Sequence, residues 1–225
     1  MGISKQIGWS PEANLYYQIS QQLERLIGVT SKVVLVPPIP TVTIGSQTWM
    51  SQNLNVDRYL NGDFIPEVQD TTTWETTTEG AWCYYDNDPV NGAIYGKLYN
   101  WYAVTDPRGL APEGYRVPSI ADYSTLFSTL GNQSDAGGPM KEVGTVHWQA
   151  PNTGATNSSG FTALPGGIRD KFAAFSLIGF INQLWTTDEN DFTSGVSYQL
   201  SNDSIGILNQ SNDKFWGSSV RCIKN

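Results

Sequence analysis

The side chains that most often carry chemistry are sparse in this chain. Its single histidine, His147, lies in a loop-like string with no cysteine, serine or aspartate at the spacing of a metal site or catalytic triad. Carboxylates cluster at 86–88 and 188–191, but neither cluster has the spaced ligands and terminal glutamate of a calcium loop. We therefore predict no catalytic residue, no metal site and no cofactor. A calcium ion bound by one acidic cluster is the alternative to ordinary solvated turns.

The cysteines and glycine pairs also give no sign of a reactive site. Cys83 and Cys222 are far apart in the sequence and have no partners at metal or redox spacing, so two buried thiols are favoured over a single disulfide. The glycine pairs at 137–138 and 166–167 lack the Lys-Ser or Lys-Thr of a phosphate loop and are interpreted as turns with positive φ. The chain is therefore predicted not to be an enzyme.

Charge and hydropathy exclude two classes of partner. The 225-residue chain has a formal net charge of −8, and an acidic protein has no basic face for nucleic acid or an anionic membrane. The apolar run 33–36 stops at Pro37, far short of the about 20 residues of a membrane span, and no secretion signal is recognisable. We expect no nucleic-acid partner and no membrane insertion.

The N-terminal region has the pattern of a helix from residue 10 to residue 28. Ser10 is a suitable N-cap and Gly28 a suitable stop. The residues of a short coiled-coil seam are Tyr16, Ile19, Leu23 and Leu26. Because two heptads are too short to be stable alone in water, this seam must be buried against another surface. We assign 1–34 as an attachment and oligomerisation helix and 35–43 as a proline-rich connector.

Residues 44–225 are predicted to form one α+β domain with long loops. A helix is expected to begin after Ser119, which can form a capping box with Asp122, and to end at Gly131. Strands are expected at 42–44, 48–50, 81–85, 97–104, 161–163, 183–187, 196–200, 205–209 and 218–223, with long polar loops at 71–80 and 144–160. Long loops in a compact domain are usually functional when they are ordered.

Seven strings occur in an order typical of one known family. They are WMSQNLN (49–55), GAWCYYDND (80–88), YGKLYNWYAV (95–104), PEGYRVPS (112–119), GFTALPGG (160–167), WTT (185–187) and SVRC (219–222). Together they closely resemble the Fibrobacter succinogenes major paralogous domain, a family abundant in Bacteroidetes. The resemblance extends from about residue 42 to the C-terminus.

The resemblance implies a relative of the C-type lectin-like fold, preceded here by the N-terminal helix. That fold also underlies formylglycine-generating enzymes and the variable proteins of diversity-generating retroelements. The resemblance further implies that residues 185–187 and 220–222 of this chain are core strands. The enzymes depend on active-site cysteines whose arrangement is not recognisable here, so an enzyme of the sulfatase-modifying type is the least favoured reading. Ala111 stands where family members usually carry a cysteine, which excludes a disulfide at that position.

The N-terminal string 7–26 resembles the leader of structural proteins from crAss-like Bacteroides phages. It implies a virion structural protein of the fibre or decoration type, made in the bacterial cytoplasm and released by lysis without a secretion signal. The helix then joins other virion proteins, and the lectin-like domain binds a host-surface glycan or protein. A homotrimer is expected by analogy with phage fibres. The alternative is a bacterial cell-surface or secreted adhesin of the same family.

The recognition surface is predicted between residues 187 and 217, because retroelement-diversified relatives carry their variable residues in the corresponding region. The candidate binding residues are Tyr198, Asn202, Asn209, Asp213 and Phe215. Amides, carboxylates and aromatic faces match sugar hydroxyls and stack on sugar rings. Ordinary solvated hairpins have the same composition and are an equal alternative.

The tryptophans are divided by their neighbours in the sequence. Trp101, Trp185 and Trp216 lie in strand-like apolar strings and are predicted to be in the core. Trp74 is isolated among threonines in the expected loop 71–80 and is predicted to be exposed. Replacement of a core tryptophan is therefore expected to cost far more stability than replacement of Trp74.

Overall fold

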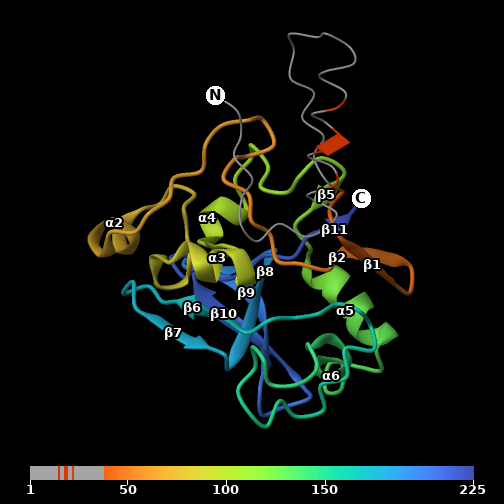
Figure 1. Cartoon of the computed structure of the whole chain (residues 1–225). Helices are drawn as coiled ribbons and strands as arrows, with labels where there is room; N and C mark the ends of the chain where they lie inside the picture. Colours follow the sequence, from red (N-terminus) through yellow and green to blue (C-terminus); the bar gives the residue numbers. More distant parts are fainter. Residues whose placement is uncertain (1–14, 16–17, 20–21, 23–37) are drawn as a thin grey trace. The chain divides into compact units, whose positions relative to one another are not determined.

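A computed structural model describes residues 15, 18, 19, 22 and 38–225 (Figure 1). The chain divides into two units, Met1–Ile39 and Pro40–Asn225, and the second is the folded domain described below. Of the predicted seam, Tyr16, Leu23 and Leu26 lie outside the described residues. Ile19 is helical and its side chain is 38% exposed.

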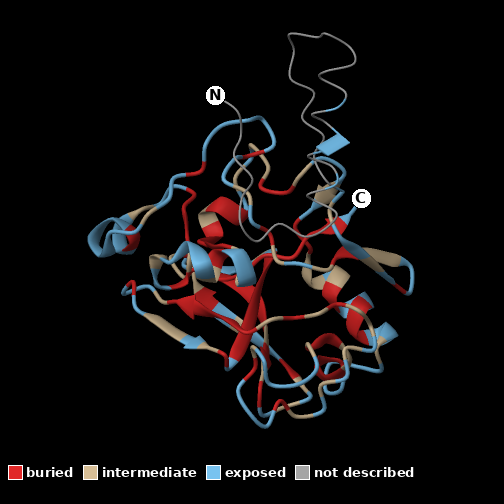
Figure 2. Cartoon of the chain, viewed as in Figure 1, coloured by how far each residue is buried: buried red, intermediate tan, exposed pale blue. Residues whose placement is uncertain are grey.

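The largest sheet has five strands in the order β10-β9-β8-β6-β7 (Figure 1). Its strands are β6 (Gly166–Arg169), β7 (Phe175–Ile178), β8 (Ile181–Asp191), β9 (Ser194–Ser201) and β10 (Ile207–Asp213). Only β6 and β8 pair in parallel, and the other neighbours are antiparallel. β8 and β9 are buried over most of their length because the sheet is covered by helices and loops (Figure 2).

Two smaller sheets and several short helices complete the α+β domain. The strands are β1 (Thr41–Ile44), β2 (Gln47–Met50), β5 (Tyr115–Arg116) and β11 (Ile223–Lys224) in the order β1-β2-β11-β5, with β3 (Trp82–Cys83) and β4 (Leu98–Tyr99) forming a separate pair. The helices are α2 (Thr71–Thr76), η1 (Tyr85–Asn87), α3 (Pro89–Tyr95), α4 (Trp101–Val104), α5 (Ile120–Thr129) and α6 (Gly137–Met140).

The predicted central helix is confirmed as α5. Ser119 and Asp122 form a capping box, and Arg116 pairs with the Asp122 carboxylate. Tyr123 and Phe127 face the core beside Trp49, whose ring centre lies 5.2 Å from that of Tyr123. Offset aromatic contacts of this kind add about 0.5–1.5 kcal/mol beyond area burial. The helix therefore joins the smaller sheet to the main core.

Two predicted segments have different secondary structure. The expected strand 97–104 ends at Tyr99, because the Asn100 side chain accepts the Ala103 N–H and begins α4. The expected loop 71–80 contains α2, which Asp70 caps in the same way. Residues 161–163 form only an isolated bridge, whereas 144–160 is a loop as predicted. The helix caps Asn100 and Asp70 therefore favour short helices in segments whose sequence patterns predicted a strand and a loop.

Trp74 is in the core, so the prediction that it is exposed is wrong. Its side chain is 1% exposed and packs with Cys83 and Leu98. The Arg169 guanidinium stacks on its ring at 4.5 Å. Trp101 and Trp185 are buried as predicted, whereas Trp216 is only half-buried. The partners of Trp74 are distant in sequence, and this is why its threonine-rich surroundings gave no sign of burial.

Of the four glycines interpreted as positive-φ turns, only Gly167 has a positive φ angle, +65°. Gly137 and Gly138 lie in α6, where a Cβ atom would come within 2.6 and 2.5 Å of the carbonyl oxygens of Ile205 and Gly154. These positions are therefore restricted to glycine by close backbone approach and not by the dihedral angle.

Both cysteines are free and buried, as favoured from the sequence. Burial raises the pKa of the Cys83 and Cys222 thiols to about 12. At pH 8 neither thiol is ionised in the folded protein, and we expect neither to react with a disulfide reagent until denaturant is added. The absorbance of the thiolate that the reagent releases measures the extent of cysteine modification. Fast reaction of one equivalent in the native protein would contradict the prediction.

Candidate functional site

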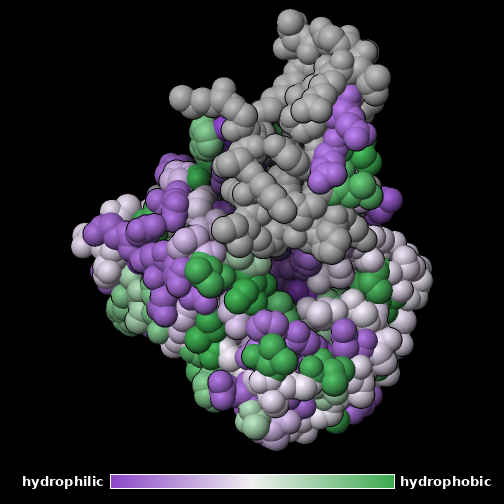
Figure 3. All heavy atoms as spheres, in the orientation of Figure 1, coloured by the Kyte–Doolittle hydropathy of each residue, from purple (hydrophilic) through white to green (hydrophobic). Residues whose placement is uncertain are grey.

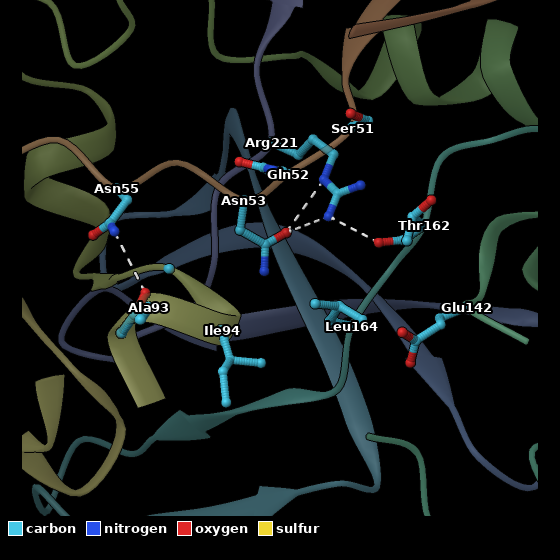
Figure 4. A pocket seen from close by; sticks show the side chains of 12 residues that line it. Ser51, Gln52, Asn53, Asn55, Ala93, Ile94, Glu142, Thr162, Leu164 and Arg221 are labelled. Carbon is cyan, nitrogen blue, oxygen red and sulfur yellow. Dashed lines mark hydrogen bonds between the residues drawn. The ribbon is translucent and has the colours of Figure 1, made fainter. Parts of the chain in front are cut away.

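A polar pocket of about 350 Å³ lies where five segments of the domain meet (Figure 4). Its lining comes from the segment after β2, from α3 and the glycine that ends it, from the loop before β6, and from single residues two positions after α6 and two positions before β11. The polar side chains are Ser51, Gln52, Asn53, Asn55, Glu142, Thr162 and Arg221. Cavities of about 300–1,000 Å³ with a few convergent polar groups are typical ligand sites.

Arg221 is the buried cation of the pocket. Its side chain is 1% exposed, and its Nε and Nη2 donate to the Asn53 Oδ1 at 3.2 and 2.7 Å. Nη1 donates to the Phe161 carbonyl, and Nη2 also reaches the Thr162 carbonyl at 3.4 Å. No Asp or Glu of residues 38–225 forms an ion pair with it. Burial lowers its pKa to about 9, which reflects this uncompensated charge.

Lys97 is a second buried cation, directly behind Asn55. Its Nζ donates to the Asn55 Oδ1 at 2.9 Å and lies 4.1 Å from the Trp82 ring centre. Burial lowers the pKa of Lys97, and the more distant carboxylates of Asp57 and Glu67 partly offset this effect. No Asp or Glu of residues 38–225 lies within ion-pair distance of Lys97. Because Oδ1 of Asn55 accepts from Lys97, its amide nitrogen is left with one long contact, 3.4 Å to the Gly92 carbonyl.

Glu142 lines the side of the pocket opposite Asn55 (Figure 4). Both of its carboxylate oxygens contact the Nδ1 of His147, at 2.9 and 3.0 Å. The His147 ring in turn meets the Tyr95 ring edge-on at 5.9 Å. The histidine interpreted as structural therefore holds the one acidic side chain of the pocket in place.

Two glycines make the pocket wall possible. Gly92 lies under the Tyr84 ring, where a Cβ would come within 2.1 Å of the ring. Gly96 has φ +77°, and a Cβ there would lie 2.8 Å from the Leu54 carbonyl oxygen. Glycine at 92 allows α3 to lie against the Tyr84 ring, and glycine at 96 allows the end of α3 to lie against the segment after β2. The amides of Asn53 and Asn55 are thereby held at the pocket.

The charges of the domain are divided between interior and surface. Residues 38–225 contain ten Lys and Arg and nineteen Asp and Glu side chains. Lys97, Lys141, Arg169, Lys214 and Arg221 are buried, whereas none of the acids is. The outer surface is therefore more acidic than the formal charge indicates, and the pocket is a local exception. Hydrophilic and hydrophobic residues are interspersed on the described part of the face in Figure 3.

Comparison with known families agrees with the sequence strings. A sequence model described as the Fibrobacter succinogenes major domain matches residues 42–224. The chain belongs to this family. No curated protein and no solved structure matches the chain. All the pocket residues lie inside the matched Fibrobacter succinogenes major domain.

The five residues predicted to bind a ligand lie elsewhere on this domain, and none lines the pocket. Tyr198 is 3% exposed and packs against Tyr123 and Phe127, so the expectation that it lies on the surface is wrong. It lines a separate pocket of about 290 Å³ beside α5, and its role in binding stays a prediction. Asn202 is buried and donates to the Ala150 carbonyl. Both side chains stabilise the fold of the Fibrobacter succinogenes major domain.

Asp213 and Phe215 come together, and Asn209 and Tyr198 are cross-strand partners on β10 and β9. The Asp213 carboxylate accepts the Phe215 N–H at 3.1 Å and lies 3.7 Å from the Lys171 Nζ. Phe215 meets the Tyr102 ring, and Asn209 is separately exposed on β10. These three remain predicted surface contacts that nothing in the structure tests.

Sequence reasoning missed the pocket, although a signal for it was present. Asn53 and Asn55 lie in the string 49–55, and Arg221 lies between Val220 and Cys222 in the last string. A cation inside a strand-like apolar string is expected to be buried and to need specific partners. Which distant residues supply those partners is visible only in the folded domain.

No helix among the described residues has the length and apolar character of a membrane span. The same residues contain no group of three or more His, Cys, Asp and Glu side chains placed to hold a metal ion.

Proposed function

We propose that this chain is a virion structural protein that displays a recognition domain for the host surface. The polar pocket of residues 38–225 is the observation that carries the binding role, because it combines a buried cation, amides and a carboxylate in one cavity of ligand size. The likeness of 7–26 to phage structural leaders supports the location on a virion. The ligand is proposed to be a host-surface glycan.

The proposal is a binding role and not catalysis. Glu142 and His147 contact each other, but within residues 38–225 no serine, threonine or cysteine side chain hydrogen-bonds to either. A nucleophile activated by a base requires such a contact. A relationship of the domain to the C-type lectin-like fold belongs to the same proposal.

The proposed attachment element is the segment 1–34, whose seam residues Tyr16, Ile19, Leu23 and Leu26 are expected to be buried on assembly. We propose a homotrimer that joins other virion proteins through this segment. Sedimentation analysis of the full chain measures the oligomer, and a monomer at all concentrations would contradict it.

Immunogold electron microscopy of purified particles tests the location. Antibody against the full chain is expected to label particles at regular positions, and the purified chain is expected to compete with particles for adsorption to host cells. Antibody that labels bacterial surfaces but not the particles would instead establish the adhesin alternative.

A further inference from the structure

Building on the proposed recognition function, we propose that the pocket binds an acidic sugar, that is, a sugar ring carrying a carboxylate. The carboxylate is placed on the side of Asn53, Asn55 and Arg221, and the ring hydroxyls face Gln52 and Glu142. Figure 4 shows these groups arranged around one cavity, with Arg221 and Asn53 between Asn55 and Glu142.

The preference for an anion comes from two buried cations behind two amides. Arg221 donates to the Asn53 Oδ1 and Lys97 donates to the Asn55 Oδ1, so each amide oxygen faces a cation. The Asn53 amide nitrogen already donates to the Tyr95 carbonyl at 2.9 Å and to the Ser219 Oγ at 3.2 Å, so Asn55 supplies the donor for the ligand. The Asn55 amide nitrogen therefore faces away from Lys97, with only its 3.4 Å contact to the Gly92 carbonyl. A carboxylate placed there accepts a hydrogen bond and is attracted by the two cations behind the amides.

Arg221 also has donor capacity to spare. A guanidinium has five N–H hydrogens, and the folded domain provides four hydrogen bonds to this one. Buried charges are costly when they are not balanced. A carboxylate in the pocket supplies the counter-charge that the described acids do not.

The preference for a sugar over a simple anion comes from Glu142, on the wall opposite Asn55, and from Gln52, which lies beside Arg221 (Figure 4). Glu142 offers two acceptor oxygens, and Gln52 is exposed and makes no hydrogen bond among the described residues, so both can bond to ring hydroxyls. A volume of about 350 Å³ accommodates one sugar ring with its bound water. The acidic outer surface repels polyanions, which favours a single charged sugar unit over a nucleic acid.

The test is an NMR titration of the full chain with three small probes: D-glucuronate, D-glucose and acetate. Glucuronate and glucose differ only in the carboxylate, and acetate has the carboxylate without the ring. Glucuronate is expected to bind at least about tenfold more tightly than either control and to shift the amide resonances of Asn53, Asn55 and Gln52. Equal affinity for glucuronate and glucose, or for glucuronate and acetate, would overturn the inference.

Two substitutions sharpen the test. Asn55→Asp keeps the oxygen that Lys97 needs but replaces the outward donor by a carboxylate oxygen, so glucuronate affinity is expected to fall at least about tenfold. Glu142→Gln removes the repulsive charge and is expected to raise the affinity for glucuronate several-fold relative to the affinity for glucose. The matched control is Glu113→Gln, which makes the same charge change at an exposed position outside the pocket.

Near-UV circular dichroism verifies the fold of each variant before binding is measured. Identical responses of Glu142→Gln and Glu113→Gln would show that the effect is the overall charge and would overturn the assignment of the pocket. Failure of all three probes to bind also overturns it. The host-recognition proposal is judged separately by particle labelling and adsorption, so the two can fail independently.

Discussion

Trp74→Ala is expected to lower the free energy of unfolding by about 3–5 kcal/mol, the range for truncating a buried aromatic side chain. The Trp74 ring is enclosed by Leu98, Cys83 and the Arg169 guanidinium, and Gly217 lies against its edge. Its removal leaves a cavity and also exposes Arg169, whose Nη2 donates to the Gln69 carbonyl at 2.9 Å. Urea denaturation measures the change.

The matched control for Trp74→Ala is Phe192→Ala. Phe192 is 91% exposed at the turn between β8 and β9, so its loss is expected to change stability by no more than about 0.5 kcal/mol. Trp185→Ala, at a position buried in the main core, is expected to match Trp74→Ala. A urea denaturation midpoint for Trp74→Ala close to that of Phe192→Ala would contradict the buried position of the Trp74 side chain.

Gly167→Ala is expected to destabilise the domain by about 3 kcal/mol or more, because two costs add. A left-handed backbone costs a non-glycine residue about 1–2 kcal/mol, and Gly167 has φ +65°. Forcing extra atoms into a packed site costs about 1–3 kcal/mol more. The added Cβ would lie 2.6 Å from the Ser176 carbonyl oxygen and 2.7 Å from the Ile178 nitrogen, both in the backbone of β7.

Gly114→Ala separates the two costs. Gly114 has φ +81° but no atom within 4 Å of the position of a Cβ, so only the dihedral cost of about 1–2 kcal/mol is expected. Thermal or urea unfolding of both variants measures the difference. Equal destabilisation would mean that β7 moves away from residue 167 at no cost.

Local patterns determined part of this fold. The helix α5 follows from Ser119, Asp122 and the apolar spacing behind them, because a capping box and an apolar face need only residues within a few positions of each other. The hydrophobic strings around Trp185 and Val196 likewise identify β8 and β9. The family follows from the order of seven strings and is confirmed over 42–224.

Local patterns failed where a distant residue decided the outcome. Trp74 was misjudged because burial depends on Arg169 and Gly217, which the threonines beside it do not reveal. The 137–138 pair was misjudged because the backbone that excludes a Cβ comes from Gly154 and Ile205. Tyr198 was predicted to lie on the surface because the stretch 187–217 has a composition that suits recognition. In the folded domain, Tyr123 and Phe127 of α5 cover its ring.

The sequence by itself determined the family, the α+β class and the capped helix α5, and it favoured two buried thiols at Cys83 and Cys222 over a disulfide. Only the tertiary structure decided which polar residues meet in the pocket. Asn53 and Arg221 are 168 positions apart, yet they share the hydrogen bonds that orient the pocket amide. The physical reason is that a capping box depends on neighbours in the chain, whereas a buried charge is satisfied by whichever acceptors the packing of remote segments brings to it.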